Sequence, residues 1–250
     1  MARVFIGTSG WAYPDWRKTF YPAGLPGSRY LEFYAREFPT AEVNYSFYRL
    51  PKPETYAKWA GQVSGDFLFS VKASRLITHT RRLDGAGEAW QAFVGNARML
   101  GARLGPILLQ FPASFRCDRN RLAAFLETAQ DAAPDDRPLR LVFEFRHESW
   151  FTPETFRLLK RFNAALCIAD SPSYPRRDLL TADFAYLRFH GRTRLFASSY
   201  SRDELAAEAR AIRRYQREGT DVFVYFNNTD RGHAIANART LTGLVGRELE

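Results

Sequence analysis

Side chains that can move protons stand at or near the ends of short apolar runs in this chain. They are two carboxylates, Glu42 and Glu144, one amine, Lys72, and one imidazole, His190. Groups of these kinds act as general acids and bases in enzymes. We predict that all four are catalytic, with Glu144 or Glu42 as the base and His190 or Lys72 as the acid or charge stabiliser.

A second set of polar and aromatic residues lies in the same runs, mostly near their ends, or shortly after them. Amides can orient a substrate, guanidinium groups can hold an anionic group through parallel hydrogen bonds, and aromatic rings can stack on a sugar or a base. We therefore predict that this set binds substrate; its members are Trp11, Asn44, Gln110, Arg146, Asp170, Arg188, Tyr225 and Asn227.

The elements that would position these residues are eight apolar runs, separated mostly by helix-like stretches. This layout is typical of a (β/α)8 TIM barrel, whose active site lies at the carboxyl ends of the strands. A doubly wound open sheet is the competing architecture, but eight runs that end in candidate site residues favour closure. The runs are Val4–Ser9, Ala41–Ser46, Phe67–Ala73, Pro106–Phe111, Arg140–Arg146, Ala165–Asp170, Ala185–His190 and Asp221–Asn228.

Alternation along each run predicts which side chains face the barrel interior. Successive strand residues point to opposite faces, so residues two positions apart share a face. In the fifth run, Glu144 and Arg146 share one face and two phenylalanines occupy the other. We assign the polar faces to the interior, because the apolar faces must pack beneath the helices. Asp170 is expected to face inward as well, together with Leu166 and Ile168.

Buried groups of mixed charge shift one another's pKa values, which is how proton-transfer groups are tuned. The alternative is an ion-pair network with a purely structural role, and for a single pair such as Glu144–Arg146 that alternative is preferred. A ring of charged and amide groups converging from seven strands indicates a binding or catalytic site instead.

Helix signals fill the intervals between the runs. Ser201 and Glu204, for example, form the pattern of a capping box, and the helix that it opens should end at Glu218, before Gly219. The segment Ser171–Asp183 is rich in Pro, Ser and Arg, and we expect it to be an irregular loop in place of a helix. No linker or repeat divides the chain, which predicts one domain over residues 1–250. The other expected helices are Ser28–Phe38, Pro53–Gln62, Glu88–Leu104, Arg119–Ala133, Thr155–Phe162 and His233–Arg247.

Two loops near the C-terminus predict a phosphate or anion site. They follow the last two runs, where TIM barrels often bind phosphate through backbone N–H groups and the N-terminus of a helix. The alternative is that the Asn- and Asp-rich sequence serves only to make turns. The predicted anion-binding residues are Gly191, Arg192, Asn228, Thr229 and Arg231.

Cofactor motifs are absent from the sequence. It contains no HExxH, no paired CxxC, no EF-hand loop, no Walker A motif and no GxGxxG. We therefore predict no cofactor and no metal site. A divalent metal held by Glu42, Glu144, Asp170 and His190 is a weaker alternative.

The composition narrows the choice of partner. The chain has 250 residues, a formal net charge of +9 and 46% hydrophobic residues. The charge favours an anionic small molecule, with nucleic acid as a second candidate. No run approaches the roughly 18 apolar residues that span a bilayer, so no membrane partner is expected. Two cysteines form no disulfide framework, and a cytoplasmic location follows as the simplest expectation. The composition points to no particular oligomeric state.

Several motifs resemble the YecE-like family, which is catalogued as a domain of unknown function. The similarity runs in order along almost the whole chain, and it is least marked in the loop 171–183. The resemblance implies a TIM-barrel fold and a loose relation to sugar-isomerase-like barrels, a group that also includes DNA-repair endonucleases. It implies no established reaction. The motifs lie at 7–13, 42–51, 69–73, 104–112, 144–150, 188–192 and 225–229.

Three functions are compatible with these features. The first is a cytoplasmic enzyme, of isomerase, lyase or hydrolase type, that performs acid–base chemistry on a phosphorylated or carbohydrate-like anionic molecule. The second is a nucleic-acid-binding or endonuclease-like protein that uses a basic, aromatic-rich barrel mouth. The third is a non-catalytic sensor. The first requires the predicted ionic residues to meet in one place.

Overall fold

Nine parallel strands form one sheet in the computed structural model, which describes residues 2–131 and 138–246. Most of them are rich in Val, Ile, Leu and Phe and are buried along nearly their whole length. This is typical of strands that have helices on one side and a packed interior on the other. The strands are β1 (Val4–Ser9), β2 (Thr40–Val43), β3 (Leu68–Lys72), β4 (Leu104–Gln110), β5 (Leu141–Glu144), β6 (Ala165–Leu166), β7 (Ile168–Asp170), β8 (Phe184–Phe189) and β9 (Asp221–Phe226).

The sheet closes on itself through the sixth predicted run. Its order is β6-β5-β4-β3-β2-β1-β9-β8-β7, so β6 and β7 lie at the two edges. These two strands are halves of one stretch, interrupted only at Cys167. β6 pairs with β5 and β7 pairs with β8, so this stretch joins the edges. The prediction of an α/β TIM barrel is confirmed, and an open sheet is excluded.

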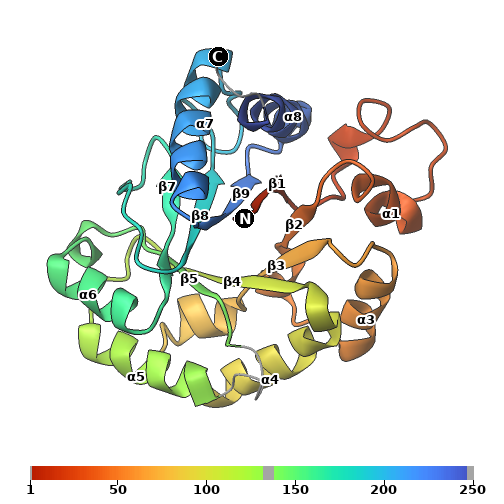
Figure 1. The fold of residues 1–250 in the computed structure, drawn as a ribbon. Helices are drawn as coiled ribbons and strands as arrows, with labels where there is room; N and C mark the ends of the chain where they lie inside the picture. Colours follow the sequence, from red (N-terminus) through yellow and green to blue (C-terminus); the bar gives the residue numbers. More distant parts are fainter. Residues whose placement is uncertain (1, 132–137, 247–250) are drawn as a thin grey trace.

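Helices surround the strands (Figure 1). Ser201 accepts a hydrogen bond from the Glu204 amide while the Glu204 side chain accepts one from the Ser201 amide, so the predicted capping box is present. No helix among residues 2–131 and 138–246 has the length and apolar character needed to cross a membrane. The α-helices are α1 (Tyr30–Tyr34), α2 (Tyr45–Tyr48), α3 (Pro53–Gly61), α4 (Gly87–Ala97), α5 (Arg119–Asp131), α6 (Pro153–Arg161), α7 (Arg202–Arg217) and α8 (His233–Val245).

Shorter helical turns lie between these elements. Most are 3-10 turns, and η3 is a π-helical turn. They are η1 (Pro14–Trp16), η2 (Gly27–Arg29), η3 (Leu76–Thr80), η4 (Arg98–Arg103), η5 (Glu148–Trp150) and η6 (Asp230–Gly232). The segment Ser171–Asp183 contains no helix or strand, as predicted.

Several predicted elements were too long. The second strand ends at Val43 rather than Ser46, because Asn44 begins the short helix α2. The predicted helix Glu88–Leu104 breaks near Gly101, whose φ of 57° is not helical. The fifth and eighth predicted runs form β5 and β9, which each end two residues before the predicted end. The first predicted helix, Ser28–Phe38, corresponds to α1, which ends at Tyr34. The ends of two predicted helices, residues 132–133 and 247, lie outside the described residues.

The interior and the outer layer of the barrel have different compositions. A small cluster that includes Phe5, Leu108, Cys167 and Phe223 fills the interior. A much larger apolar cluster lies between the strands and the helices. The interior is also where polar residues of the strands point, and at the carboxyl ends of the strands these residues replace the apolar ones.

Candidate functional site

A fully buried guanidinium lies at the centre of the barrel mouth, the end formed by the carboxyl ends of the strands. Arg188, on β8, donates to Glu42 through Nε at 2.9 Å and Nη2 at 2.7 Å, and to Glu144 through Nη1 at 2.6 Å. Glu42 belongs to β2 and Glu144 to β5. All three side chains are at most 1% exposed. The paired contacts on Glu42 form the strong bidentate geometry of an arginine–carboxylate bridge.

Hydroxyl groups complete the hydrogen bonding of Glu42. Ser9 Oγ donates to Oε1 at 2.6 Å, and the Tyr186 hydroxyl donates to Oε2 at 2.6 Å. Burial alone would raise the pKa of Glu42, but the Arg188 guanidinium, together with the Ser9 and Tyr186 hydroxyls, outweighs burial and holds this pKa below its ordinary value. Glu42 is therefore ionised at neutral pH and has both of its oxygens engaged.

Glu144 is contacted by two cations and an imidazole. Arg146 Nε donates to Oε1 at 2.9 Å, and His190 Nε2 lies 3.5 Å from the same oxygen. Burial opposes ionisation, but Arg188 and then Arg146 hold the pKa of Glu144 well below its ordinary value. Burial also lowers the pKa of His190, so the ring is uncharged at pH 7. The Asn227 amide nitrogen lies 3.1 Å from His190 Nδ1, and Arg188 Nη1 lies 3.3 Å from Nε2, so hydrogen-bond donors approach both ring nitrogens.

We call this group the inner cluster. It unites five of the predicted site residues with two hydroxyl residues, and all of them come from the mouth end of the barrel. The inner cluster consists of Ser9, Glu42, Glu144, Arg146, Tyr186, Arg188 and His190.

Lys72 borders the inner cluster but has a different environment. Its Nζ donates to Gln110 Oε1 at 2.8 Å and lies 4.2 Å from the centre of the Phe47 ring. No carboxylate of the described residues lies within ion-pair distance of this amine. Burial, followed by the repulsion of Arg188, lowers the pKa of Lys72 from 10.5 to about 7. The residue as a whole is partly exposed, and its amine is desolvated enough to be readily neutral.

The irregular segment Ser171–Asp183 contributes an aromatic residue to the mouth. Arg146 Nη1 donates to the Tyr174 hydroxyl at 3.2 Å, and its guanidinium carbon lies 4.1 Å from the centre of the Tyr174 ring. The same ring packs edge-on against His190, with centroids 6.2 Å apart. Tyr174 therefore borders the mouth beside Arg146.

Comparison with known proteins assigns the chain to a family. Residues 5–250 match the family model described as "Protein of unknown function DUF72". The chain belongs to the DUF72 family. It is similar to the UPF0759 protein YunF of Bacillus subtilis (strain 168), with 26% identity over 276 residues that cover 98% of this chain and 95% of YunF. UPF0759 protein YecE of Escherichia coli (strain K12) is 34% identical over 112 residues, 45% of this chain and 39% of YecE.

Solved structures of the family have the same fold. A DUF72 family protein from Thermotoga maritima superposes with a TM-score of 0.86 at 29% identity, covering 98% of this chain and 100% of that one. A DUF72 family protein from Enterococcus faecalis gives a TM-score of 0.82 at 22% identity, covering 99% and 97%. The predicted resemblance to the YecE-like family is confirmed. These comparisons establish the fold and family of the DUF72 chain, and they show no specific function.

One predicted site residue of this DUF72 barrel faces the opposite way. Leu166 and Ile168 pack in the outer apolar layer, and Ala165 and Cys167 face the interior. The prediction that Asp170 points inward is therefore wrong. The interior at this level holds bulky side chains such as those of Tyr186 and Arg188, so only small residues of the sixth run fit there.

Asp170 instead joins a second ionic group on the outer side of the barrel, which we call the outer cluster. Arg176 Nη1 lies 2.8 Å from Asp170 Oδ2 and 2.9 Å from Glu208 Oε1, and Arg192 Nη2 lies 3.0 Å from Asp170 Oδ2. The Tyr200 hydroxyl donates to Asp170 Oδ1 at 2.8 Å. These contacts tie the segment 171–183 and the loop after β8 to α7. The outer cluster consists of Asp170, Arg176, Asp178, Arg192, Tyr200 and Glu208.

The predicted anion loop of the DUF72 chain is largely engaged in internal contacts. Arg192 faces the acidic residues of the outer cluster. The fully buried Asn228 donates to the Ser198 carbonyl, and the Gly191 amide donates to the Tyr200 hydroxyl. The Arg231 side chain is 80% exposed, with Asp230 at 3.9 Å.

Thr229 completes that predicted set. Its carbonyl accepts a hydrogen bond from Trp16 Nε1 at 3.2 Å. Four of the five predicted anion-binding residues thus make contacts with other groups of the protein, and the nearest ionic group to the fifth, Arg231, is the carboxylate of Asp230.

Two other predicted binding residues are set apart from the mouth. The Trp11 ring packs against Trp59 and Phe69, in the apolar layer outside the barrel. Tyr225 faces the interior as predicted, but it is fully buried and its hydroxyl lies 2.7 Å from Thr40 Oγ1. Trp11 lines a cavity outside the barrel instead.

The remaining predicted residues lie at the mouth. Asn44 and Asn227 directly follow β2 and β9 and are partly exposed. Asn44 Oδ1 is buried and has no hydrogen-bond partner in the part of the chain that the structure describes. Gln110 is buried, and its side-chain oxygen accepts the hydrogen bond that positions the Lys72 amine.

The alternative metal site is not assembled. Its four hypothetical ligands include Asp170, which belongs to the outer cluster. Within residues 2–131 and 138–246, no group of three or more His, Cys, Asp and Glu side chains is arranged to hold a metal ion.

Sequence reasoning missed three residues of the site. Ser9 ends the first run and Tyr186 shares the inward face of Arg188, so alternation could have found both as partners of a buried carboxylate. Tyr174 lies in an irregular segment, where no periodic signal indicates the direction of a side chain.

Proposed function

We propose that this DUF72 protein is an enzyme that performs acid–base chemistry on an anionic small molecule, phosphorylated or carbohydrate-like, at the barrel mouth. The observation that carries the proposal is the environment of Lys72. A desolvated amine with a single amide acceptor, no carboxylate partner and a pKa of about 7 is suited to both accepting and donating a proton at neutral pH. Perturbed groups of this kind gather at functional sites.

In this proposal the two buried glutamates have supporting roles. Both oxygens of Glu42 are already bonded, and the pKa of each carboxyl is lowered, so neither accepts a proton readily at pH 7. They hold Arg188 in the interior, and Arg188 in turn helps to keep the Lys72 amine neutral. The neutral His190, between Glu144 and Asn227, is the second candidate for proton transfer.

The partly exposed rim of the mouth supplies groups for an anionic ligand. Arg146 has a side chain that is 13% exposed and can turn a guanidinium face toward a phosphate or carboxylate. Asn227 offers an amide, and the unpartnered Asn44 Oδ1 can accept from a substrate hydroxyl. The local field is positive: burial, followed by repulsion from Lys72 and Arg146, lowers the pKa of His79 to about 4.

Two measurements test this function. The first is the pKa of Lys72, read by NMR after reductive ¹³C-methylation of lysines and assigned with the Lys72→Met variant. The second is a ligand screen by saturation-transfer NMR with sugar phosphates, sugar acids and neutral sugars, with Lys160→Met as the matched control for the loss of one lysine. We expect a pKa of about 7 for Lys72 and anion-selective binding that Lys72→Met and Arg146→Met both weaken by roughly tenfold. An ordinary pKa for Lys72 would favour the non-catalytic sensor.

Nucleic acid is a second candidate, favoured by exposed aromatic and basic residues at the mouth. Tyr45 and Tyr48, in α2, are 51% and 81% exposed. Arg75, in the loop after β3, is also exposed and close enough to influence His79. Aromatic rings beside cations are a common surface for stacking single-stranded bases. Binding of an oligonucleotide that weakens steeply with added salt and is lost in a Tyr48→Ala variant would support this function over a small-molecule substrate.

A cytoplasmic location is part of the proposal. Cys117 and Cys167 are both free thiols, and free thiols are typical of reducing compartments. Fractionation of the source cells, with detection of the native protein by antibody, tests this location; recovery in a secreted fraction would contradict it.

A further inference from the structure

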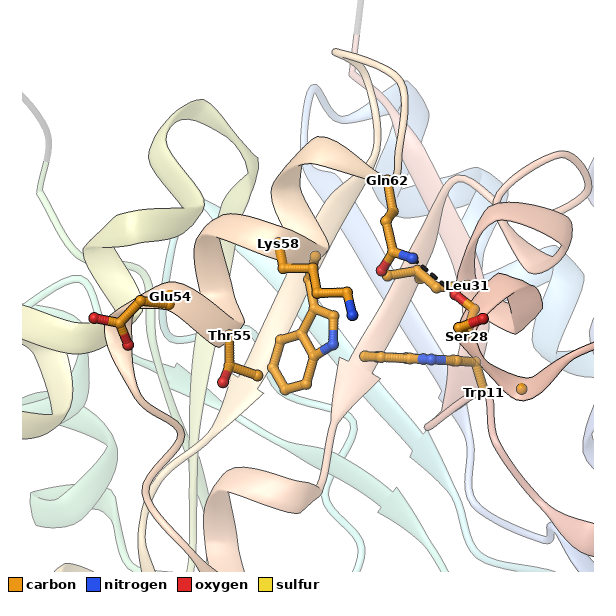
Figure 2. A pocket seen from close by; sticks show the side chains of 9 residues that line it. Trp11, Ser28, Leu31, Glu54, Thr55, Lys58 and Gln62 are labelled. Carbon is orange, nitrogen blue, oxygen red and sulfur yellow. Dashed lines mark hydrogen bonds between the residues drawn. The ribbon is translucent and has the colours of Figure 1, made fainter.

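A cavity outside the barrel contains unused binding groups and is separate from the mouth. It lies between α3 and the segment Gly27–Leu31 and has a volume of about 400 Å³. Pockets for small ligands commonly have volumes of roughly 300–1,000 Å³. Figure 2 shows its lining side chains, which include Trp11, Ser28, Glu54, Lys58, Trp59 and Gln62. No residue of the inner or outer cluster is among them.

Trp11 provides a rigid aromatic surface in this cavity. Its ring meets Trp59 edge-to-face at 5.4 Å and Phe69 at 6.0 Å, and its carbonyl accepts a hydrogen bond from the Tyr21 hydroxyl. These contacts fix the ring from two sides and through the backbone, while the side chain stays partly exposed. A held, partly exposed indole offers stacking area without the entropy cost of ordering a flexible side chain.

Lys58 directs a free charge into the same space. Glu54 precedes it by four residues on α3, a spacing at which glutamate and lysine normally pair. Within the described chain neither residue takes part in an ion pair. Figure 2 shows the Lys58 amine directed toward Trp11, whereas the Glu54 carboxylate points the other way. The cavity therefore combines an aromatic face with an ammonium group that lacks a counter-ion.

Gln62 closes one side of the cavity. Its Nε2 donates to the Ser28 carbonyl at 2.8 Å, which links the end of α3 to the segment before α1 (Figure 2). The amide oxygen of Gln62 and the hydroxyl of Ser28 remain as groups that can bond to a ligand.

We propose that this cavity is a binding site for a small acidic carbohydrate, a sugar ring that carries a carboxylate or a phosphate. The C–H face of the ring stacks on Trp11, the anionic group pairs with Lys58, and ring hydroxyls bond to Gln62 and Ser28. The aromatic face selects a ring, and the unpaired ammonium selects the negative charge.

The test is a set of affinities measured by saturation-transfer NMR and calorimetry for glucuronate, glucose 6-phosphate and glucose. Glucuronate and glucose 6-phosphate distinguish a carboxylate from a phosphate, and glucose measures what the ring contributes alone. We expect at least one of the two anions to bind roughly tenfold more tightly than glucose. Failure of both anions to saturate at high millimolar concentration would overturn the proposal.

Variants locate the site. Lys58→Met is expected to weaken binding of the anion by about tenfold, and Trp11→Leu should remove it. Lys52→Met is the matched control, because Lys52 is an exposed lysine that precedes α3 and does not line the cavity. Affinities for the cavity are compared in the Lys72→Met background, in which binding of the same ligands at the barrel mouth is weakened; the binding that remains should be lost on adding Lys58→Met, so failure here is distinct from failure of the proposed active site. Unchanged affinity in Lys58→Met would contradict the assignment, and so would an equal loss of affinity at the cavity in Lys72→Met. An unchanged melting temperature of Lys58→Met shows that this variant is folded.

Discussion

The inner and outer clusters are built from the same kinds of residues but differ in how their charges are enclosed. Arg188 is 1% exposed and is bonded by two carboxylates from other strands. Arg176, its counterpart in the outer cluster, is 25% exposed and is contacted by three carboxylates, one of which is itself 53% exposed. If a carboxylate partner is removed, water can solvate part of the Arg176 guanidinium, whereas no water reaches Arg188 to take the place of its partners.

This difference separates two uses of an arginine–carboxylate network. The outer cluster fastens a long irregular segment to a helix, and its cation and anions face each other directly. The inner cluster pairs two arginines with two glutamates, and Lys72 lies beside it with no carboxylate of the described residues at ion-pair distance. In the proposed function it is therefore the amine of Lys72, rather than the ion pairs beside it, that distinguishes the inner region from the outer cluster.

The largest effect is expected from Arg188→Met. The change leaves Glu42 and Glu144 buried without their main partner, and breaking a buried network in this way costs about 3–5 kcal/mol of unfolding free energy. Urea denaturation followed by circular dichroism measures the loss. Arg217→Met, at an exposed position at the end of α7, is the control and should change stability by less than about 0.5 kcal/mol. A loss below about 1 kcal/mol for Arg188→Met would mean that solvent reaches the inner cluster.

A smaller effect is expected from Arg176→Met. The outer cluster loses its best-connected cation, but partial exposure limits the cost to about 1–3 kcal/mol. The segment 171–183 should exchange its amide hydrogens faster, because Arg176 connects it to Glu208 on α7. Hydrogen exchange read by mass spectrometry reports this directly. Equal exchange in the variant and the wild type would show that other contacts hold the segment.

The pH dependence of stability sharpens the comparison at Lys72. Its pKa is lowered from 10.5 to about 7 in the folded protein, so between these values the unfolded chain binds the extra proton. The unfolding free energy of the wild type should therefore rise relative to that of Lys72→Met as the pH increases from about 7 to about 10. Parallel denaturation series at several pH values measure the difference, with Lys160→Met as control. Identical curves for the wild type and Lys72→Met would mean that the amine titrates normally.

The smallest effect is expected from Arg231→Gln. This side chain is 80% exposed and its nearest carboxylate lies 3.9 Å away, so the variant should keep its stability within about 0.5 kcal/mol. Thermal unfolding in low salt checks this. A larger loss of unfolding free energy would mean that Arg231 stabilises the loop after β9 more than its contacts indicate.

Much of the fold and of the inner cluster could be predicted from sequence, because strand alternation carries strong physical constraints. Glu144 alternates with phenylalanines that must pack under helices, so its inward direction was unambiguous. The sixth run offered no such contrast, because both of its faces are apolar apart from Asp170. The prediction that Leu166, Ile168 and Asp170 face the interior therefore depended on Asp170 alone. The sizes of Leu166 and Ile168 against Ala165 and Cys167 were the usable signal, since a crowded interior admits only the small set.

Loops limited the remainder of the prediction. Arg192 and Trp11 follow strands, and a position after a strand does not indicate which way a side chain turns. Arg192 turns outward because Asp170, Glu204 and Glu208 provide its counter-charges. Those partners come from β7 and α7, and no spacing in the sequence links them to the loop.

The burial of Arg188 also constrains how the chain can reach its final form. Its two carboxylate partners lie 146 and 44 positions away along the chain. A guanidinium cannot shed its proton to avoid an apolar environment, so any half-assembled barrel that buries it before both partners arrive is disfavoured by several kcal/mol. The centre of the barrel is therefore expected to become dry only when β2, β5 and β8 are all in place.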